Sequence, residues 1–283
     1  MQKKVNIELK NKLRTLIHAE TRLLDLLIHR LVEKEYLDQE QEIISETIKI
    51  MLQSIGISMH SVLKLTEEVD MAIKDCFGIA RTISEMSINV AYIASSDVGV
   101  ANRAQTHAFQ RTYRDLKRST KNNVVSIKVE ASGIPDPGDI NGLQAALNMF
   151  TTKKGKEIKA WSPKSLDEKI EHIGQFDKKA AQSLTVSKFT IYQYSSQLLH
   201  GSYYGVKYFW TSPNGKKLDD LGFEENWLNS HFMTVFTAVF FGASGVIETC
   251  INKFGIVDLK EVLTELFDRA SEIILPLEQD DST

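Results

Sequence analysis

Apolar residues recur at helical spacing along most of the chain. In the first segment they occupy positions 9, 13, 16, 17, 23, 24, 27 and 31, which predicts one long amphipathic helix that ends near Tyr36. The same pattern predicts helices over about 40–66 and 67–95, and acidic residues at the start of the latter suit a helix N-terminus. A more highly charged helix is expected over 101–121. The pattern therefore predicts an all-α fold.

The helical pattern stops between residues 122 and 160. The stretch VVSIKVE could be a short extended piece, and GIPDPGD predicts a loop because each proline disfavours helix in the residue before it. Helix resumes at Asp139 with INGLQAALNMF, and the basic loop TTKKGKEIK follows. We interpret 122–160 as an irregular insertion or flap in a single helical-bundle domain of residues 1–275, although the length also allows two smaller domains.

Helix returns after Trp161. Ser162 is placed to cap a helix whose first residue is Pro163, where the missing amide costs nothing. This short helix is expected to reach Phe176. A longer helix is expected from Asp177 to about His200, where Gly201 ends it.

The last third of the chain is aromatic and then strongly apolar. The run SYYGVKYFW and the turn TSPNGKK connect to an apolar helix over about 224–253, and a last amphipathic helix covers 258–275. Pro276 ends that helix, so residues 276–283 are expected to form a disordered acidic tail.

Residues 226–247 contain no charged side chain and are nearly long enough to cross a bilayer. Polar residues at the start of this stretch favour a buried core helix over a membrane span. The N-terminal MQKKVNIELKNKL carries charges where a signal peptide needs apolar residues, and the two cysteines, Cys76 and Cys250, form no disulfide framework. We therefore expect a cytoplasmic protein.

The composition, 42% hydrophobic and 25% charged, is that of an ordinary globular protein. A net charge of −3 argues against a protein that coats nucleic acid nonspecifically, so any contact with RNA or DNA must be local. The chain has no glycine-rich phosphate loop, no H-E-x-x-H or G-x-S-x-G motif and no metal-spaced Cys or His cluster. We expect neither a metal nor a cofactor.

Two helical faces combine polar groups that could carry chemistry. Arg81, Glu85 and Asn89 lie at i, i+4 and i+8, so Arg81 and Glu85 should pair; the apolar sequence around them predicts partial burial, while a plain intrahelical salt bridge is the alternative. Tyr192, Ser196 and His200 share the same spacing. A histidine in the last turn of a helix is favoured in its protonated form and suits proton transfer, or it simply caps the helix. We interpret Ser196 as a positioning group.

A third face is basic. Its members follow one another at increments of 4, 4, 3 and 4 and are Arg103, His107, Arg111, Arg114 and Arg118. Such a stripe could hold a phosphate backbone, and a solvated helix face with local acidic partners is the alternative.

The stretches GIARTISEMSINVAYIAS, KAWSPKSL and YQYSSQLLHGS resemble an uncharacterised bacterial family with R-x-x-x-E and Y-x-x-x-S-x-x-x-H-G helices, over about residues 40–210. That family is similar to the HEPN group (higher eukaryotes and prokaryotes nucleotide-binding), helical bundles that are frequently dimeric ribonucleases of toxin–antitoxin and phage-defence systems. The resemblance implies a HEPN-like multi-helix bundle. The HEPN signature places an arginine five to seven positions before its histidine, where this chain has Gln193, Tyr194 and Ser195. Only His200 carries over.

The leading hypothesis is a metal-independent endoribonuclease or RNA-binding protein. His200 would transfer the proton, Arg81 would stabilise the charge on phosphorus and Glu85 would orient Arg81, while Tyr192, Ser196, Asn89 and the basic stripe would hold the RNA. RNA carries its own 2′-hydroxyl nucleophile, so no metal is needed. The alternative is a non-enzymatic interaction or regulatory subunit with a structural Arg–Glu–His network. We expect a homo-oligomer, a dimer formed through helical faces, or a partner protein, and no membrane contact.

Overall fold

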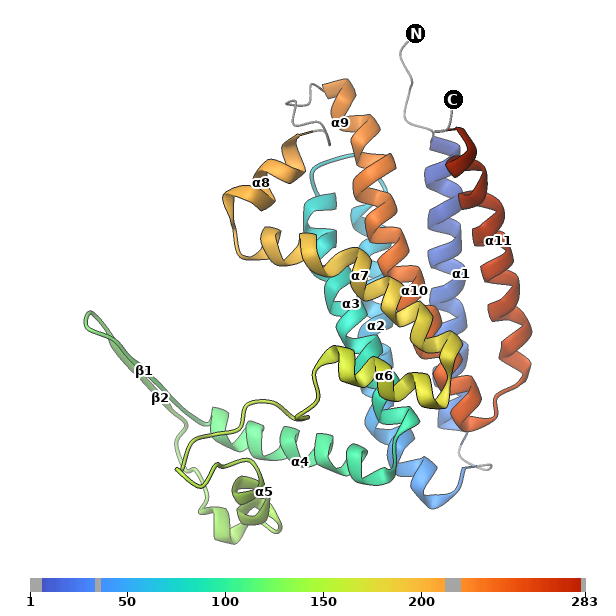
Figure 1. The fold of residues 1–283 in the computed structure, drawn as a ribbon. Helices are drawn as coiled ribbons and strands as arrows, with labels where there is room; N and C mark the ends of the chain where they lie inside the picture. The colour runs from blue at the N-terminus through green and yellow to red at the C-terminus, as the bar shows by residue number, and fades with distance from the viewer. Residues whose placement is uncertain (1–6, 34–36, 212–219, 281–283) are drawn as a thin grey trace. The chain divides into compact units, whose positions relative to one another are not determined.

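The structure, a computed structural model, describes residues 7–33, 37–211 and 220–280 (Figure 1). This part of the chain is almost wholly helical, with one two-stranded antiparallel sheet, so the predicted all-α class is confirmed. Contacts divide the chain into two compact units: unit 1 contains Met1–Ser95 and Leu166–Thr283, and unit 2 contains Ser96–Ser165. The predicted insertion of residues 122–160 lies inside unit 2.

The first helices of unit 1 follow the predicted periodicity. Helix α1 (Ile7–Val32) ends before the predicted position near Tyr36, which lies outside the described residues. Helix α2 (Gln39–Leu65) begins with a capping box, in which Asp38 accepts from the Gln41 amide and the Gln41 side chain accepts from the Asp38 amide.

Helix α3 (Ile73–Ser95) starts six residues later than predicted. The Asp70 carboxylate accepts from the Ala72 amide at 2.7 Å and thereby stabilises a turn ahead of the helix.

The helices after unit 2 are bounded by local capping. Helix α6 (Leu166–Phe176) starts three residues later than predicted from Pro163, because the Ser162 hydroxyl accepts from the Lys164 amide and closes a local turn. Helix α7 (Lys178–Leu199) is capped by Asp177, and Gly201 with φ 62° follows its last turn, as predicted.

The aromatic run predicted to be a connection forms helix α8 (Tyr203–Trp210), which is capped by the Ser202 hydroxyl. The prediction missed this helix because a run of aromatic residues carries no 3.6-residue apolar pattern of its own.

The apolar segment forms α9 (Asp220–Asn226), one stretch of π-helix, η3 (Trp227–Phe232), and α10 (Met233–Phe254). Helix α11 (Asp258–Asp280) continues past Pro276, where the sequence predicted its end. Proline removes one backbone hydrogen bond from a helix, and the remaining backbone hydrogen bonds allow the helix to continue. Of the predicted tail, residues 281–283 lie outside the described part of the chain.

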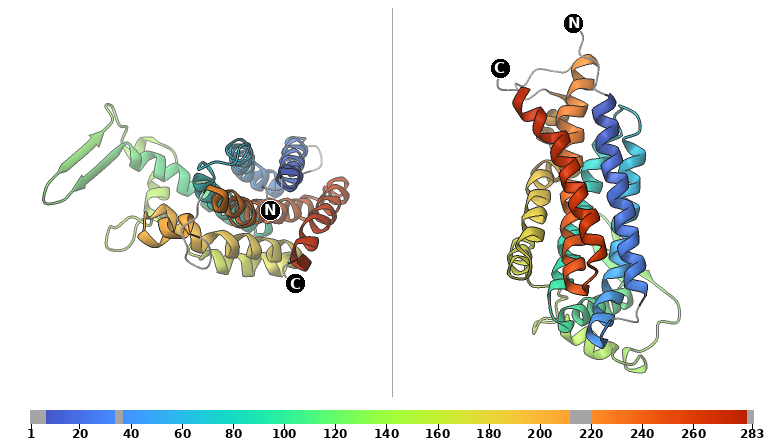
Figure 2. Two further views of the ribbon diagram at one scale, coloured as in Figure 1. Left: turned by 90° about the horizontal axis from the view of Figure 1, so that it is seen from above. Right: turned by 90° about the vertical axis from the view of Figure 1, so that its right-hand side faces the viewer.

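Helix α10 lies at the centre of unit 1. It packs against α7, α3, α1 and α11, and the view down the bundle in Figure 2 shows it among them. Phe236 and Phe240 in its first half are fully buried, as is Phe232 at the end of η3 just before it. Residues Gly222–Phe254 are long and apolar enough to cross a membrane, but 83% of their most apolar window is buried in the structure, as in the core helix of a soluble protein.

Unit 2 begins with α4 (Val98–Asp115), which is shorter than predicted. Residues predicted to extend this helix to Lys121 instead form β1 (Lys117–Lys121), antiparallel to β2 (Ser126–Glu130), so the extended piece expected in VVSIKVE is confirmed. The Asn122 carboxamide accepts from the Val124 and Val125 amides and thereby fixes the turn of the hairpin. All the strand residues are exposed.

The rest of unit 2 contains two short helices, where the sequence predicted one from Asp139. A 3-10 turn, η2 (Pro137–Asp139), precedes α5 (Leu143–Met149), and Gly142 with φ 76° separates them.

Candidate functional site

The predicted pair on α3 is formed. Arg81 Nε donates to Glu85 Oε1 at 2.8 Å, and the two side chains are 21% and 36% exposed, which confirms partial burial. Burial lowers the pKa of Arg81, but the hydrogen bond and charge of Glu85 outweigh it, so the pKa is raised overall. Arg81 therefore stays charged.

Helix α7 brings Tyr192 to this pair. The Arg81 guanidinium carbon lies 4.2 Å from the centre of the Tyr192 ring, a cation–π contact between α3 and α7. Arg81, Glu85 and Tyr192, singled out from two separate stretches of sequence, thus lie in one cluster.

Asn89, the third predicted residue of this face, has a partner that the sequence did not indicate. Lys169 Nζ of α6 donates to Asn89 Oδ1, the side-chain oxygen, at 2.7 Å, although the lysine is only 6% exposed. Burial lowers the pKa of Lys169, and the Glu85 charge opposes the change. A signal was present: Lys169 lies four residues before the buried Ile173, on the apolar side of α6.

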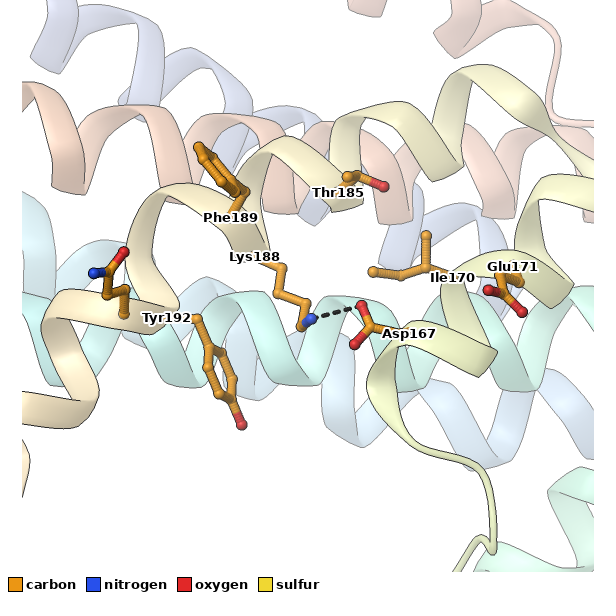
Figure 3. Close-up of a pocket in the computed structure, with 8 residues that line it drawn as sticks. Asp167, Ile170, Glu171, Thr185, Lys188, Phe189 and Tyr192 are labelled. Atoms are coloured by element: carbon orange, nitrogen blue, oxygen red, sulfur yellow. Dashed lines mark hydrogen bonds and ion pairs between the residues drawn. The ribbon is translucent and has the colours of Figure 1, made fainter.

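A groove of about 510 Å³ lies beside this cluster, between α6 and α7. Figure 3 shows Lys188 reaching from α7 to Asp167 of α6, at 2.6 Å, next to Tyr192. The groove also contains Phe189, whose side chain is 84% exposed. Its charged lining consists of two carboxylates, those of Asp167 and Glu171, and one ammonium group, that of Lys188, so this groove does not favour an anion.

Ser196 and His200 lie further along α7. The Ser196 carbonyl accepts from the His200 amide at 3.1 Å, so the histidine occupies the C-cap position, and its side chain is exposed. Within the described residues, no hydrogen bond or ion pair joins the His200 side chain to Arg81 or Glu85. The proposed proton-transfer group therefore stands outside the cluster that contains the proposed charge-stabilising group.

Three members of the predicted basic stripe hold the end of unit 2 against α4. Arg103 Nε donates to the Trp161 carbonyl at 2.8 Å, and its guanidinium carbon lies 4.7 Å from the centre of the Phe150 ring. His107 Nε2 lies 3.0 Å from the Lys159 carbonyl oxygen. Arg114 donates to the Gln110 and Thr151 side chains, at 2.6 and 2.7 Å.

The other two members differ. Arg111 pairs with Glu157 at 2.6 Å and with Asp115 at 3.4 Å. Arg118 is not on the helical face at all, because α4 ends at Asp115; it lies on β1, opposite Val129, and is exposed.

Arg111, Arg114 and Arg118 nevertheless meet at a groove of about 610 Å³ within unit 2. The basic side chains that line it are Arg111, Arg114, Lys117, Arg118 and Lys159. Two acidic residues, Asp115 and Glu157, also line it, together with Tyr113, Ser119 and Leu147. We call this the basic groove. Sequence reasoning missed Lys159, which lies in the loop that the stripe arginines hold.

Charge is divided unevenly between the units. Residues 96–165 contain 12 Lys and Arg but 6 Asp and Glu, a net charge of +6, whereas the whole chain carries −3. Unit 1 therefore carries −9. Such asymmetry between parts of one chain is typical of a surface that meets a polyanion.

No group of three or more His, Cys, Asp or Glu side chains in the described ranges could hold a metal ion. Both cysteines are buried, and burial raises the pKa of each thiol to about 12, so they remain protonated.

Comparison with known proteins places the chain in a family without assigning an activity. No curated protein matches the chain, and no solved structure matches it. A family profile matches residues 58–217, from the last part of α2 through unit 2 to beyond α8. This range contains Arg81, Glu85, Tyr192 and His200 as well as the basic groove. The chain belongs to this family of unknown function (DUF5677).

Proposed function

We propose that this protein binds RNA through the basic groove of unit 2. The observation that carries the proposal is the groove itself: five basic side chains and a tyrosine line one hollow, against two carboxylates. Phosphate groups are bound by such clusters because each contact releases condensed counterions from the nucleic acid.

The partners of these side chains support a role in binding. Arg111 is compensated by Glu157 and Asp115, and Arg114 is held by neutral groups, so both are fixed in place. Arg118 and Lys159 are exposed. A groove with fixed arginines and accessible cations can take a phosphate with little side-chain ordering.

The choice of RNA comes from the resemblance of the Y-x-x-x-S-x-x-x-H-G helix to the HEPN group. The same resemblance is the reason for proposing a bacterial toxin or phage-defence system, a cytoplasmic location and a homodimer. Cleavage is a further step that would need Arg81 and His200 to act together. The contacts of the described residues lend it no support, and the proposal is limited to binding.

A binding assay tests the proposal. Fluorescence anisotropy of a labelled RNA should show binding by the full chain, and the double variant Arg118→Gln, Lys159→Gln should weaken it by about tenfold, since two phosphate contacts are removed. The matched control is Lys12→Gln, Lys74→Gln, which changes net charge equally on exposed side chains of unit 1. Equal losses in both double variants, or no binding by the wild type, would contradict the proposal.

The length of the RNA after incubation tests cleavage in the same experiment. Intact RNA agrees with a binding protein. If the wild type shortens the RNA and the His200→Ala variant leaves it intact, the endoribonuclease hypothesis would instead be established.

A non-enzymatic interaction or regulatory subunit is the second candidate function. It is favoured by the contacts of Arg81, which are made within unit 1 to Glu85 and Tyr192, as expected of a structural network.

A further inference from the structure

Helix α8 presents a row of aromatic and basic side chains to solvent. Tyr203, Lys207 and Trp210 lie at i, i+4 and i+7, so they share one face of the helix. Tyr203 is 84% exposed and Trp210 is 42% exposed, with Tyr204 beside them at 55%. We call Tyr203, Tyr204, Lys207 and Trp210 the α8 face.

The opposite side of α8 is firmly packed, so the α8 face is fixed in orientation. Phe209 is 1% exposed and stacks on His231, with ring centres 4.6 Å apart. Tyr208 stacks on Tyr194 of α7 at 4.3 Å. Aromatic side chains on a rigid helix lose little conformational freedom when a ligand stacks on them.

Acidic side chains are absent from the sequence around this helix. Residues 178–218 contain six lysines and no Asp or Glu, although Asp and Glu make up 37 of the 283 residues of the chain. Unit 1 as a whole carries −9, so this stretch is an exception within an acidic unit. A helix that carries exposed aromatic rings, a lysine and no acidic residue of its own suits a ligand with flat rings and negative charge.

We propose that the α8 face is a stacking platform for unpaired bases of single-stranded RNA. Bases would stack on Tyr203 and Trp210, while Lys207 would contact a phosphate between them. Along the helix axis Lys207 is about 6 Å, and Trp210 about 10 Å, from Tyr203, a span that fits consecutive nucleotides of one strand. A duplex has its bases already stacked and cannot use such a surface.

The inference rests on the proposed function for the identity of the ligand, but on different residues. A second copy of the chain is a poorer occupant. Two-fold symmetry would bring Lys207 towards its own copy, and helix α8 itself carries no carboxylate to compensate.

The test uses the full chain, a labelled single-stranded oligouridine of about 20 nucleotides and a blunt RNA duplex of equal length. Tyr203→Ala and Trp210→Ala should each weaken binding of the single strand about fivefold or more, and duplex binding should not change. Tyr203→Phe keeps the ring and should bind like the wild type. The control Phe176→Ala removes an aromatic side chain at the end of α6 whose exposure, 43%, is close to the 42% of Trp210.

The outcomes separate the two proposals. Unchanged single-strand binding by Tyr203→Ala and Trp210→Ala, with a loss in the basic-groove double variant, overturns the α8 inference and leaves the proposed function standing. The reverse pattern supports the α8 face and contradicts the basic groove. No RNA binding by the wild type overturns both. If light scattering shows that Tyr203→Ala converts a dimer into a monomer, the α8 face is a subunit interface and the inference is wrong.

Discussion

At the scale of single residues, His231 is the buried group with the clearest response to pH. It is fully buried in the π-helical stretch, with Nε2 2.9 Å from Asn226 Nδ2 and 3.2 Å from the Phe209 carbonyl oxygen. Burial lowers its pKa from 6.5 to about 4, and the bond to Phe209 opposes the change. Neutral His231 therefore stabilises the fold above pH 6.5, and this contribution is lost as pH falls through 4.

We expect the free energy of unfolding to fall by about 3 kcal/mol from this residue between pH 6.5 and 4. In the His231→Gln variant this part of the pH dependence should be absent, whatever the variant's stability at pH 7.5. Urea unfolding at several pH values measures both curves. Parallel curves for the two proteins would show that His231 does not titrate in this range.

A substitution of Arg81 shows whether the cluster of Arg81, Glu85 and Tyr192 stabilises the fold or binds a ligand. If its contacts with Glu85 and Tyr192 serve the fold, Arg81→Gln should lower the free energy of unfolding by about 1 kcal/mol, the sum expected of a partly exposed ion pair and one cation–π contact. RNA affinity should be unchanged. The control Arg22→Gln removes an exposed arginine of α1. Unchanged stability together with a loss of RNA affinity would place Arg81 in the binding surface.

At the scale of elements, α8 depends on a close approach to the end of α7. A Cβ atom added to Gly205 would lie 2.5 Å from the Gln197 carbonyl oxygen, and backbone cannot yield as a flexible side chain can. We therefore expect Gly205→Ala to displace α8 and to lower the free energy of unfolding by about 1–3 kcal/mol.

The displacement should also move Trp210, which lies on α8. The tryptophan emission spectrum of the protein, to which Trp210 contributes, should therefore change. Gly201→Ala is a useful comparison, because nothing lies within 4 Å of the added atom there and only the positive φ is strained. Native-like stability and fluorescence of Gly205→Ala would mean that α8 does not need this contact.

At the scale of the whole molecule, the division of charge predicts how RNA binding responds to salt. The net charge of −3 would by itself suggest repulsion, but the basic groove offers five cations against two carboxylates. About three phosphates should therefore be neutralised, which gives a slope of about −2 for log K against log salt on single strands.

Anisotropy titrations between about 50 and 300 mM NaCl measure this slope. The Arg118→Gln, Lys159→Gln variant should have a slope smaller in magnitude by about 1.4, since two of the contacts are removed. A slope near zero in the wild type would exclude phosphate contacts as the source of affinity.

What the sequence determined by itself was local. Apolar periodicity predicted the all-α class, and side-chain rules predicted the end of α7 at Gly201 and the Arg81–Glu85 pair, because these depend on residues within a turn or two of each other. Two predicted helix boundaries were wrong, because a local alternative to the helix was also available to the chain. The Ser162 hydroxyl accepts from the Lys164 amide in a turn and does not cap α6, and residues after α4 pair as a hairpin.

Tertiary structure alone decided which of these local features meet. Packing of α3 on α7 put Tyr192 against Arg81 and left the His200 side chain exposed at the end of α7. Yet Tyr192 and His200 follow each other at regular spacing along the same helix. It gathered Lys159 and Arg118 into one groove and buried Glu20 with its carboxylate bonded to Ser244, so that burial raises the pKa of Glu20 well above its usual range. Periodicity specifies which side of a helix is apolar, whereas burial and charge compensation depend on the neighbour that packs against it.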